Sequence, residues 1–484
     1  MTNRPEFELT PGLWAELPQQ AQVLITAMQA HIDGLETRVR ELETRLDQNS
    51  QNSSRPPSSD PPGFKRPQSP NSSRGRKRGG QPGHRGHHRI EYSESEIDEV
   101  VELHPSGCEK CGTRLEGRAQ DERQWCHQVV ELPEARVKVT EYRLHSSKCP
   151  GCGHRVSAEL PSGVPSRPFG PRLQATAAML TGRYRLSRRE AQRLLKDLWG
   201  VKISLGALSG LEGATSGALE SVINDVAGSV KGAAVVNVDE TGWRENGSRG
   251  WVWTAVTEGV TLFRIDSRRS GDVVVGLVGE NFRGVVGSDR YSAYKRIAIG
   301  QRALCYAHLK RNFQSLVDRG GEAERVGSWG IREMGRLFTL WHSYRNGEED
   351  WRGLQRGLRP IKARFGKLLE YGKWVEDPKA WGLCWNLSEL WEGLWTFCRV
   401  EGVEPTNNGA ERALRPVVLW RKGSFGSQSS RGSRFAERML TISASCRQQK
   451  RDLLSFLVDA CRAALSGTSP PSLVPYYPPS PQGT

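Results

Sequence analysis

Two apolar segments of this chain each end in an acidic side chain, and this arrangement constrains the fold more than any other feature. The segment AAVVNV is followed directly by Asp239 and Glu240, and the segment FRGVVGS is followed by Asp289. Short apolar runs without polar alternation are typical of strands buried inside a sheet. Since neighbouring strands can end at one edge of a sheet, the sequence predicts that Asp239 and Asp289 lie close together.

The residues between these acids predict a mixed α/β core. The segments GWVWTAVT and VTLFRIDS have the pattern of two further strands, and SGDVVVGLVGE has the pattern of a short helix. The expected order over 233–300 is therefore three strands, a helix and a fourth strand.

A third acid can join the first two from a helix. The segment EPTNNGAERALRPVV places Glu411 near a helix start, which Asn407 or Asn408 would cap. Crowded carboxylates repel one another unless a cation lies between them, and their oxygens suit Mg²⁺ or Mn²⁺. Two such ions can serve phosphoryl transfer. Glu240 would face the other side of its strand from Asp239, and we do not expect it to bind metal.

The charge of the chain favours a polyanionic partner. It has 69 Lys and Arg against 54 Asp and Glu, a formal net charge of +15, which favours nucleic acid but also fits a merely basic protein. No apolar run approaches the roughly 18 residues of a membrane-spanning helix, and the first residues lack a signal-peptide pattern. We expect no membrane contact and a cytoplasmic, reducing location.

The N-terminal region predicts an assembly element. Residues 21–46 show apolar side chains spaced alternately by four and three residues, with β-branched residues at one position and Leu at the other. This pattern favours a parallel two-stranded coiled coil, with Arg38 and Glu43 able to pair between chains, although a helix docked on its own protein would share it. The two sets are Ile25, Ile32, Val39 and Leu46, and Ala21, Met28, Leu35 and Leu42.

A basic segment follows over residues 48–90. It is rich in Ser, Pro, Gly and Arg and carries nine Lys or Arg against one acid, Asp60. Such a segment cannot build a core and binds phosphate backbones, though a solvated linker is the alternative. The basic residues expected to contact DNA here are Arg74, Arg76, Lys77 and Arg78.

Four cysteines then occur in two CxxC pairs. The pairs are Cys108 with Cys111 and Cys149 with Cys152. In a reducing compartment two such pairs favour a tetrahedral structural zinc site, whereas a redox site needs only one pair. The intervening segment VVELPEARVKVTEYRLH alternates like strands and predicts a hairpin under the metal.

Residues 171–218 predict helices. Ser187 can cap one helix, which Gly200 can end, and Ser204 can cap the next. Such a pair can place its second helix in a DNA major groove, or it can be an ordinary helical pair. Around Glu411, a basic helix face would hold phosphates through Arg412, Arg415, Arg421 and Lys422.

At this point the chain resembles a known family, the DDE transposases of the insertion sequence 66 family. The resemblance runs from NSSRPPSSD and KRGGQPGHRGH through the double CxxC region, VDETGW, SDRYSAY and CYAHLKR to NNGAERALRP. Two positions depart from the family pattern, Thr406 before the paired Asn residues and Arg290 after the second acid.

The resemblance implies an enzyme that cleaves and joins DNA at the terminal inverted repeats of a bacterial mobile element. It implies an RNase H-like catalytic domain interrupted by an α-helical insertion, with Asp239, Asp289 and Glu411 as catalytic residues holding two Mg²⁺ or Mn²⁺ ions. Eight of the fifteen Trp residues lie between 329 and 395, which fits that insertion. Auxiliary roles would fall to Cys305 and His308, which form a CxxH motif, and to Asn408.

The expected organisation is multidomain α/β. Besides terminal repeats and target DNA, the expected partners are a second copy of the chain, accessory proteins of the same element and the bacterial nucleoid. The alternatives are a non-catalytic, dimeric, zinc-containing DNA-binding regulator derived from a transposase, and a host nuclease. The predicted parts are a coiled-coil helix (1–47), a disordered basic linker (48–90), a zinc-binding β module (91–160), a helix-turn-helix-like DNA-binding region (161–230), the first part of the catalytic core (231–315), the helical insertion (316–403), the last part of the core (404–466) and a disordered tail (467–484).

Overall fold

The computed structural model describes residues 14–15, 17–47, 91–115 and 126–475. The chain divides into two compact units. The larger comprises Met1–Phe64, Glu141–Lys196 and Lys202–Thr484, and the smaller comprises Lys65–Thr140 and Asp197–Val201. No helix among the described residues is both long enough and apolar enough to cross a membrane.

The predicted N-terminal helix is present as α2, Gln19–Asp47. Its apolar stripe is exposed in the single chain: Met28, Leu35 and Leu42 are 56%, 53% and 45% exposed. Leaving a polar surface in water costs little free energy. Leaving this apolar stripe in water is unfavourable, and contact with another apolar surface would be stabilising. The four basic residues predicted to contact DNA, Arg74, Arg76, Lys77 and Arg78, lie outside the described residues.

The predicted hairpin between the cysteine pairs is wrong. Residues 126–145 form no strand, and Val129, Leu132 and Val139 are 76%, 86% and 84% exposed. Alternation gives a strand only where one face is buried, and here neither face is covered. The only strands described within 91–160 are β1, Ser146–Lys148, and β2, Arg155–Ser157, which pair antiparallel around the second CxxC.

Four helices precede the main sheet, and two predicted caps among them are confirmed. At the start of one helix, the Ser187 backbone N–H donates to the Glu190 carboxylate and the Glu190 backbone N–H donates to the Ser187 hydroxyl. At the start of the next, the Ser204 hydroxyl accepts from the Ala207 N–H at 3.1 Å. Gly200 takes a φ of +67° after α4, where a side chain would strain the backbone. The helices are α3 (Pro171–Gly182), α4 (Arg188–Trp199), α5 (Leu205–Ala218) and α6 (Glu220–Lys231).

The central sheet has the predicted order of three strands, a helix and a fourth strand, and it adds a fifth strand. The strands lie in the order β5-β4-β3-β6-β7. β3, β4 and β5 are antiparallel neighbours, whereas β6 and β7 run parallel to β3. The elements are β3 (Val235–Glu245), β4 (Ser248–Val256), β5 (Thr261–Asp266), α7 (Gly271–Val278), β6 (Val285–Ser288) and β7 (Arg302–Leu304).

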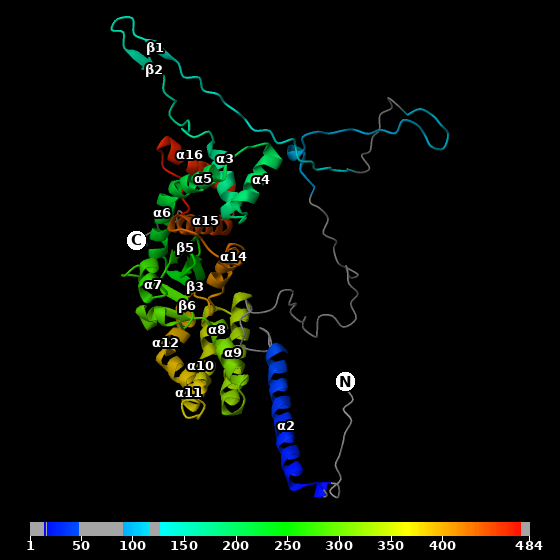
Figure 1. Cartoon of the computed structure of the whole chain (residues 1–484), viewed down its shortest axis with the longest axis vertical. Helices are drawn as coiled ribbons and strands as arrows, with labels where there is room; N and C mark the ends of the chain where they lie inside the picture. The colour runs from blue at the N-terminus through cyan, green and yellow to red at the C-terminus, as the bar shows by residue number, and fades with distance from the viewer. Residues whose placement is uncertain (1–13, 16, 48–90, 116–125, 476–484) are drawn as a thin grey trace. The chain divides into compact units, whose positions relative to one another are not determined.

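Helices cover both faces of this sheet (Figure 1). Val236 and Val238 of β3 pack on one face against α6, α7, α15 and α16. Trp243 of β3 packs on the other face against α14 and α15. The two sets of residues follow from the alternation of side chains along one strand. The covering helices from the C-terminal region are α14 (Asn408–Ser424), α15 (Ser430–Gln448) and α16 (Leu453–Ser466).

A helical segment between β7 and α14 has its own apolar core, built around aromatic rings. The Trp395 indole is 1% exposed and contacts the rings of Tyr306, Phe365, Trp391 and Phe397 at centroid distances of 5.6–6.5 Å. This Trp-rich region is helical, in keeping with its sequence pattern. The helices are α8 (Tyr306–Val317), α9 (Gly321–Arg345), α10 (Trp351–Gly372), α11 (Pro378–Glu389), α12 (Trp391–Leu394) and α13 (Thr396–Arg399).

Trp395→Ala should lower the free energy of unfolding of this segment by about 3–5 kcal/mol, because it removes a buried ring and leaves a cavity. Trp374→Ala is the matched control, since that indole is 87% exposed and its loss should change stability little. Urea denaturation followed by circular dichroism measures both. Equal destabilisation by the two variants would contradict this account of the core.

Candidate active site

Strand pairing brings the first two predicted acids together. β3 and β6 are parallel and pair Val235 with Val285 and Asn237 with Gly287. Continuing this register by two residues sets Asp239 opposite Asp289, which directly follows β6. The approach is close, because a Cβ on Gly287 would lie 2.2 Å from Asn237 Oδ1. A side chain at 287 would therefore displace the Asn237 amide, and glycine leaves room for it beside the two acids.

The third acid enters on α14, whose start is attached to β3. Asn407 is 1% exposed, and its side-chain Nδ2 donates to the Val238 carbonyl at 2.8 Å. Its backbone N–H donates to Cys305 Sγ at 3.2 Å. The sequence predicted a cap at Asn407 or Asn408, but the Asn407 side chain bonds β3 instead of capping α14. Among the described residues it is Asn407, not the predicted auxiliary Asn408, that makes this link.

The three acids share one electrostatic environment. Burial, followed by the negative charges of Glu240, Asp289 and Glu411, raises the pKa of Asp239 to about 8, against the backbone N–H of Glu240 at 2.9 Å, which lowers it. Mutual repulsion of this kind requires the carboxylates to be close neighbours. A divalent cation bound among them would remove the repulsion, and carboxylate oxygens are the ligands Mg²⁺ and Mn²⁺ prefer.

Glu240 lies in a different environment from Asp239. Its side chain is 2% exposed and accepts two hydrogen bonds from Arg269, at 2.6 and 2.9 Å. The Tyr294 hydroxyl donates to it at 2.5 Å, and Tyr294 belongs to the core on the α6 and α7 face of the sheet. The carboxylate of Glu240 is therefore already paired with a cation. The sequence did not identify Arg269 and Tyr294 as its partners, because both are remote along the chain.

Of the four basic residues predicted around Glu411, three are exposed and one is held by the sheet. Arg412, Arg415 and Lys422 are exposed on α14. Arg421 instead donates to the Gly242 carbonyl at 2.6 Å and to Thr241 Oγ1 at 3.4 Å. Arg421 thus attaches the end of α14 to β3, while Arg415 and Lys422 share the helix face of Glu411 by their spacing.

The CxxH motif lies directly beside the third acid. His308, in the first turn of α8, places Nδ1 3.2 Å from Glu411 Oε1, and Arg311 Nη2 is 3.7 Å from the same oxygen. Burial and the Arg311 charge lower the pKa of His308. Sequence spacing gave no sign of this contact, since His308 and Glu411 are separated by the entire helical segment.

Arg290, a departure from the family pattern, joins the second acid to the helical segment. Its guanidinium donates to Asn312 Oδ1 of α8 at 3.0 Å and to Asn386 Oδ1 of α11. Burial lowers its pKa, against the opposing effect of Asp289. The residue after Asp289 is therefore a structural contact here.

The two cysteine pairs lie in turns of one form. The Cys108 N–H donates to the Thr113 carbonyl at 2.9 Å and the Gly112 N–H to the Cys108 carbonyl at 2.8 Å. The second turn repeats this, from Cys149 to His154 at 2.8 Å and from Gly153 to Cys149 at 2.9 Å. Gly112 and Gly153 both take positive φ, +72° and +74°, which favours glycine. Each turn presents its two thiols, Cys111 or Cys152 being the exposed one.

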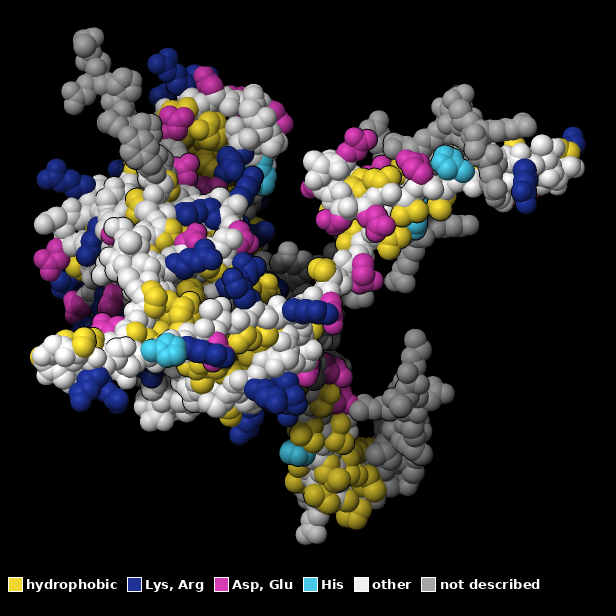
Figure 2. Space-filling model, turned by 90° about the horizontal axis from the view of Figure 1, so that it is seen from above, with side chains coloured by type: hydrophobic (Ala, Val, Ile, Leu, Met, Phe, Trp, Pro, Cys, Tyr) yellow, Lys and Arg dark blue, Asp and Glu magenta, His cyan; other side chains and the backbone are white. Residues whose placement is uncertain are grey.

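In the helical pair, the basic residues lie on the first helix, α4, and not on the second, α5, which the sequence offered for a DNA groove. α5, the second helix, contains no Lys or Arg and buries Leu208, Leu211 and Glu212. α4 is largely exposed and carries its charged residues on the exposed side. Figure 2 shows Lys and Arg side chains spread over this end of the larger unit. Any phosphate contact from this pair therefore belongs to α4. Its basic residues are Arg188, Arg189, Arg193 and Lys196.

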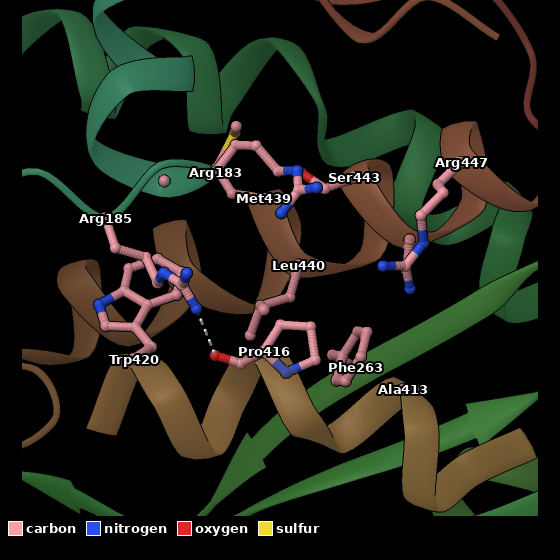
Figure 3. A pocket seen from close by; sticks show the side chains of 12 residues that line it. Arg183, Arg185, Phe263, Ala413, Pro416, Trp420, Met439, Leu440, Ser443 and Arg447 are labelled. Atoms are coloured by element: carbon pink, nitrogen blue, oxygen red, sulfur yellow. Dashed lines mark hydrogen bonds between the residues drawn. The ribbon is translucent and has the colours of Figure 1, made fainter. Parts of the chain in front are cut away.

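A small cavity lies on the side of α14 that faces away from Glu411 (Figure 3). It has a volume of about 20 Å³ and is lined by Arg183, Arg185, Pro416 and Trp420, among others. Arg185 Nη1 donates to the Pro416 carbonyl at 3.3 Å. This volume holds no more than about a water molecule, so the cavity is a packing feature between α14 and the turn after α3.

Comparison with known families agrees with the order of these parts. The model of the family described as "Transposase IS66 family" matches residues 167–435, more than half of the chain. That of the "zinc-finger binding domain of transposase IS66" matches residues 105–153, which include both cysteine pairs. A family of unknown function matches residues 10–90.

Relatives with curated sequences come from Sinorhizobium fredii and are named as uncharacterized. The protein y4hP is 26% identical over 410 residues, 75% of this chain and 71% of that protein. The protein y4qI is 26% identical over 234 residues, which are 43% of each chain. The chain thus matches less than half the length of y4qI.

The raised pKa of Asp239 predicts how pH and Mg²⁺ affect stability. The folded state binds this proton more tightly than the unfolded chain does. The stability that the protonated Asp239 contributes is therefore fully present below pH 3.8 and is lost as the pH rises to about 8. Mg²⁺ binds the ionised form, so it should raise the Tm more at about pH 9 than at about pH 6.

Asp239→Asn should raise the Tm of the metal-free protein at about pH 9 and abolish the effect of Mg²⁺, because no charge is left to bury. Asp225→Asn, at an exposed position of α6, should leave both unchanged. Differential scanning calorimetry of the full chain measures these shifts. An Asp239→Asn protein that Mg²⁺ stabilises as much as the parent would overturn the assignment.

Proposed function

Because the chain belongs to the IS66 family of transposases, we propose that it cleaves the DNA ends of a mobile element and joins them to target DNA. The observation that carries this proposal is that Asp289, at the end of β6, and Glu411, at the start of α14, are near enough to Asp239 of β3 for their charges to raise its pKa. The mixed strand order with an acid at each of these points supports the RNase H-like assignment.

The donor set fits divalent metal ions. Asp239 has an elevated pKa and no cation partner among the described residues, whereas the neighbouring Glu240 is paired with Arg269. Bound Mg²⁺ or Mn²⁺, two per site, would supply activation of a hydroxyl or water and stabilisation of the leaving oxygen. Asp239, Asp289 and Glu411 would hold the ions.

The remaining residues of the site position DNA. Arg415 and Lys422 extend from the Glu411 face of α14 and would bind the phosphates beside the cleaved bond, with Arg412 next to them. Exposed Arg and Lys of α4 would bind phosphates farther along the duplex. The segment with Arg74, Arg76, Lys77 and Arg78 would add affinity that does not depend on base sequence.

Zinc would be structural in this protein. The match to a zinc-finger domain over residues 105–153 supports it, and Cys108 with Cys111 and Cys149 with Cys152 lie in two turns of one form. We propose that these four thiolates hold one zinc ion. No described residue of 91–115 and 126–160 is buried, so a bound metal would be the main source of stability there.

The catalytic proposal is tested by substitutions that remove the charge of one carboxylate and keep the size of its side chain. Asp239→Asn, Asp289→Asn and Glu411→Gln should each reduce strand cleavage by about a thousandfold or more, since each removes a metal ligand. DNA binding should change little. The assay is cleavage and transfer of a labelled element end in Mg²⁺, beside a gel-shift measurement.

Glu258→Gln is the matched control, since Glu258 is exposed in the turn between β4 and β5. If Glu411→Gln stays active, another residue is the third acid. Parental activity in all three variants rejects this mechanism. A parent protein that binds ends but never cleaves them would favour the alternative of a DNA-binding regulator.

Dimerisation through α2 would bring two active sites to two element ends. Replacing both Leu35 and Leu42 by Lys puts charge into the exposed apolar stripe and should convert a dimer to a monomer. Sedimentation equilibrium of the full chain at micromolar concentration measures this, with Gln29→Lys, exposed on the same helix, as control. A parent that sediments as a monomer would contradict the coiled coil.

A further inference from the structure

A thiol, an imidazole and a carboxylate converge beside the catalytic acids. Cys305 precedes α8, His308 lies in its first turn, and Glu411 lies in the first turn of α14. Each offers one ligand atom, and these atoms all lie within 4.8 Å of one another. The sequence alone supplied only two of them, which are too few for a metal site. The third comes from the fold.

We propose that Cys305, His308 and Glu411 form a zinc-binding site separate from the cysteine turns. His308 Nδ1 and Glu411 Oε1 are buried atoms that make no hydrogen bond, although they are 3.2 Å apart. Buried polar atoms without partners are costly, and a cation between them would satisfy both. Cys305 Sγ accepts one hydrogen bond, from the Asn407 N–H, and keeps a lone pair for a metal.

The donor types select zinc over magnesium. A thiolate and an imidazole suit Zn²⁺, whereas Mg²⁺ prefers oxygen ligands alone. Tetrahedral zinc with bonds of about 2.0–2.3 Å needs ligand atoms roughly 3.5 Å apart. The ligand atoms lie within 4.8 Å of one another, so binding zinc would require them to move closer by about 1 Å. Three protein ligands leave a fourth position for water.

Two features make this site weaker than the four-thiolate one. Arg311 Nη2 lies 3.7 Å from Glu411 Oε1 and repels a cation. The site also has one thiolate ligand, where the cysteine turns offer four. Zinc should therefore exchange readily here, while it stays bound in the cysteine turns.

Occupancy would regulate the enzyme, and this consequence rests on the proposed function. Zinc bound to Glu411 Oε1 would compete with the catalytic ions for the Glu411 carboxylate. Zinc at Cys305 and His308 would thus withdraw the third catalytic ligand and stop strand cleavage until the ion leaves. The site would thus respond to the concentration of free zinc. The carboxylate ligands alone would discriminate poorly between zinc and Mg²⁺.

The test is the zinc content of the full chain in equilibrium dialysis at a fixed free Zn²⁺ concentration. The parent should hold one zinc more than Cys305→Ser, His308→Gln or Glu411→Gln. Cys398→Ser, a partly buried thiol of α13, is the matched control and should keep the parental content. Cys149→Ser should lose the other zinc. Parental zinc content in the first three variants overturns the site.

Cobalt gives a measurement that does not depend on Cys305→Ser folding. In the parent with zinc already in the cysteine turns, added Co²⁺ should produce a thiolate-to-cobalt absorption band, and His308→Gln should lack it. A parent without the band overturns the site.

A cleavage assay distinguishes the proposed zinc site from the proposed catalytic role of Glu411. Each protein is assayed in Mg²⁺ with and without added Zn²⁺, and its activity is compared with its own zinc-free value. Zinc should inhibit the parent at least tenfold and His308→Gln less than twofold. Equal inhibition of both overturns the regulatory role. A Glu411→Gln protein that loses zinc yet cleaves normally refutes the catalytic role of Glu411 and leaves the zinc site standing.

Discussion

The parallel pairing of β3 with β6 is the contact on which the rest of the site depends. It carries Asp239 and Asp289 to one edge of the sheet, and Gly287 lets the strands approach closely. The Asn407 side chain then bonds the Val238 carbonyl, one residue before Asp239, so that α14 starts where β3 ends its apolar run. Backbone hydrogen bonds and one amide thus hold charges together that repel one another.

Alternation along β3 separates two acids that are neighbours in sequence. Asp239 faces α14, and burial together with the neighbouring acids raises its pKa to about 8. Glu240 faces the core of α6 and α7, where it pairs with the Arg269 guanidinium and accepts a hydrogen bond from Tyr294. One strand therefore presents a carboxylate with a cation partner on one face and a carboxylate with acidic neighbours on the other. The difference lies in the partners that each face supplies.

Sequence patterns predicted what depends on local order. The apolar runs before Asp239 and Asp289 gave the strands, and Ser187 and Ser204 gave the helix starts. The same reasoning failed for the hairpin between the cysteine pairs, because alternation cannot show whether another surface covers a strand. It also could not show that α5 is packed in the core. The contact of His308 with Glu411 depends on tertiary packing over 103 residues, which no local pattern records.

The helical segment enters and leaves the core at one point, and that point adjoins Glu411. The Tyr306 N–H donates to the Pro405 carbonyl at 2.9 Å, and the Asn407 N–H donates to Cys305 Sγ at 3.2 Å. Its apolar core also includes Val285 and Leu304 of the sheet. Because both ends are tied beside the acids, loosening the segment would release the start of α14, and Glu411 would lose its fixed position. The segment therefore helps to hold the site in place.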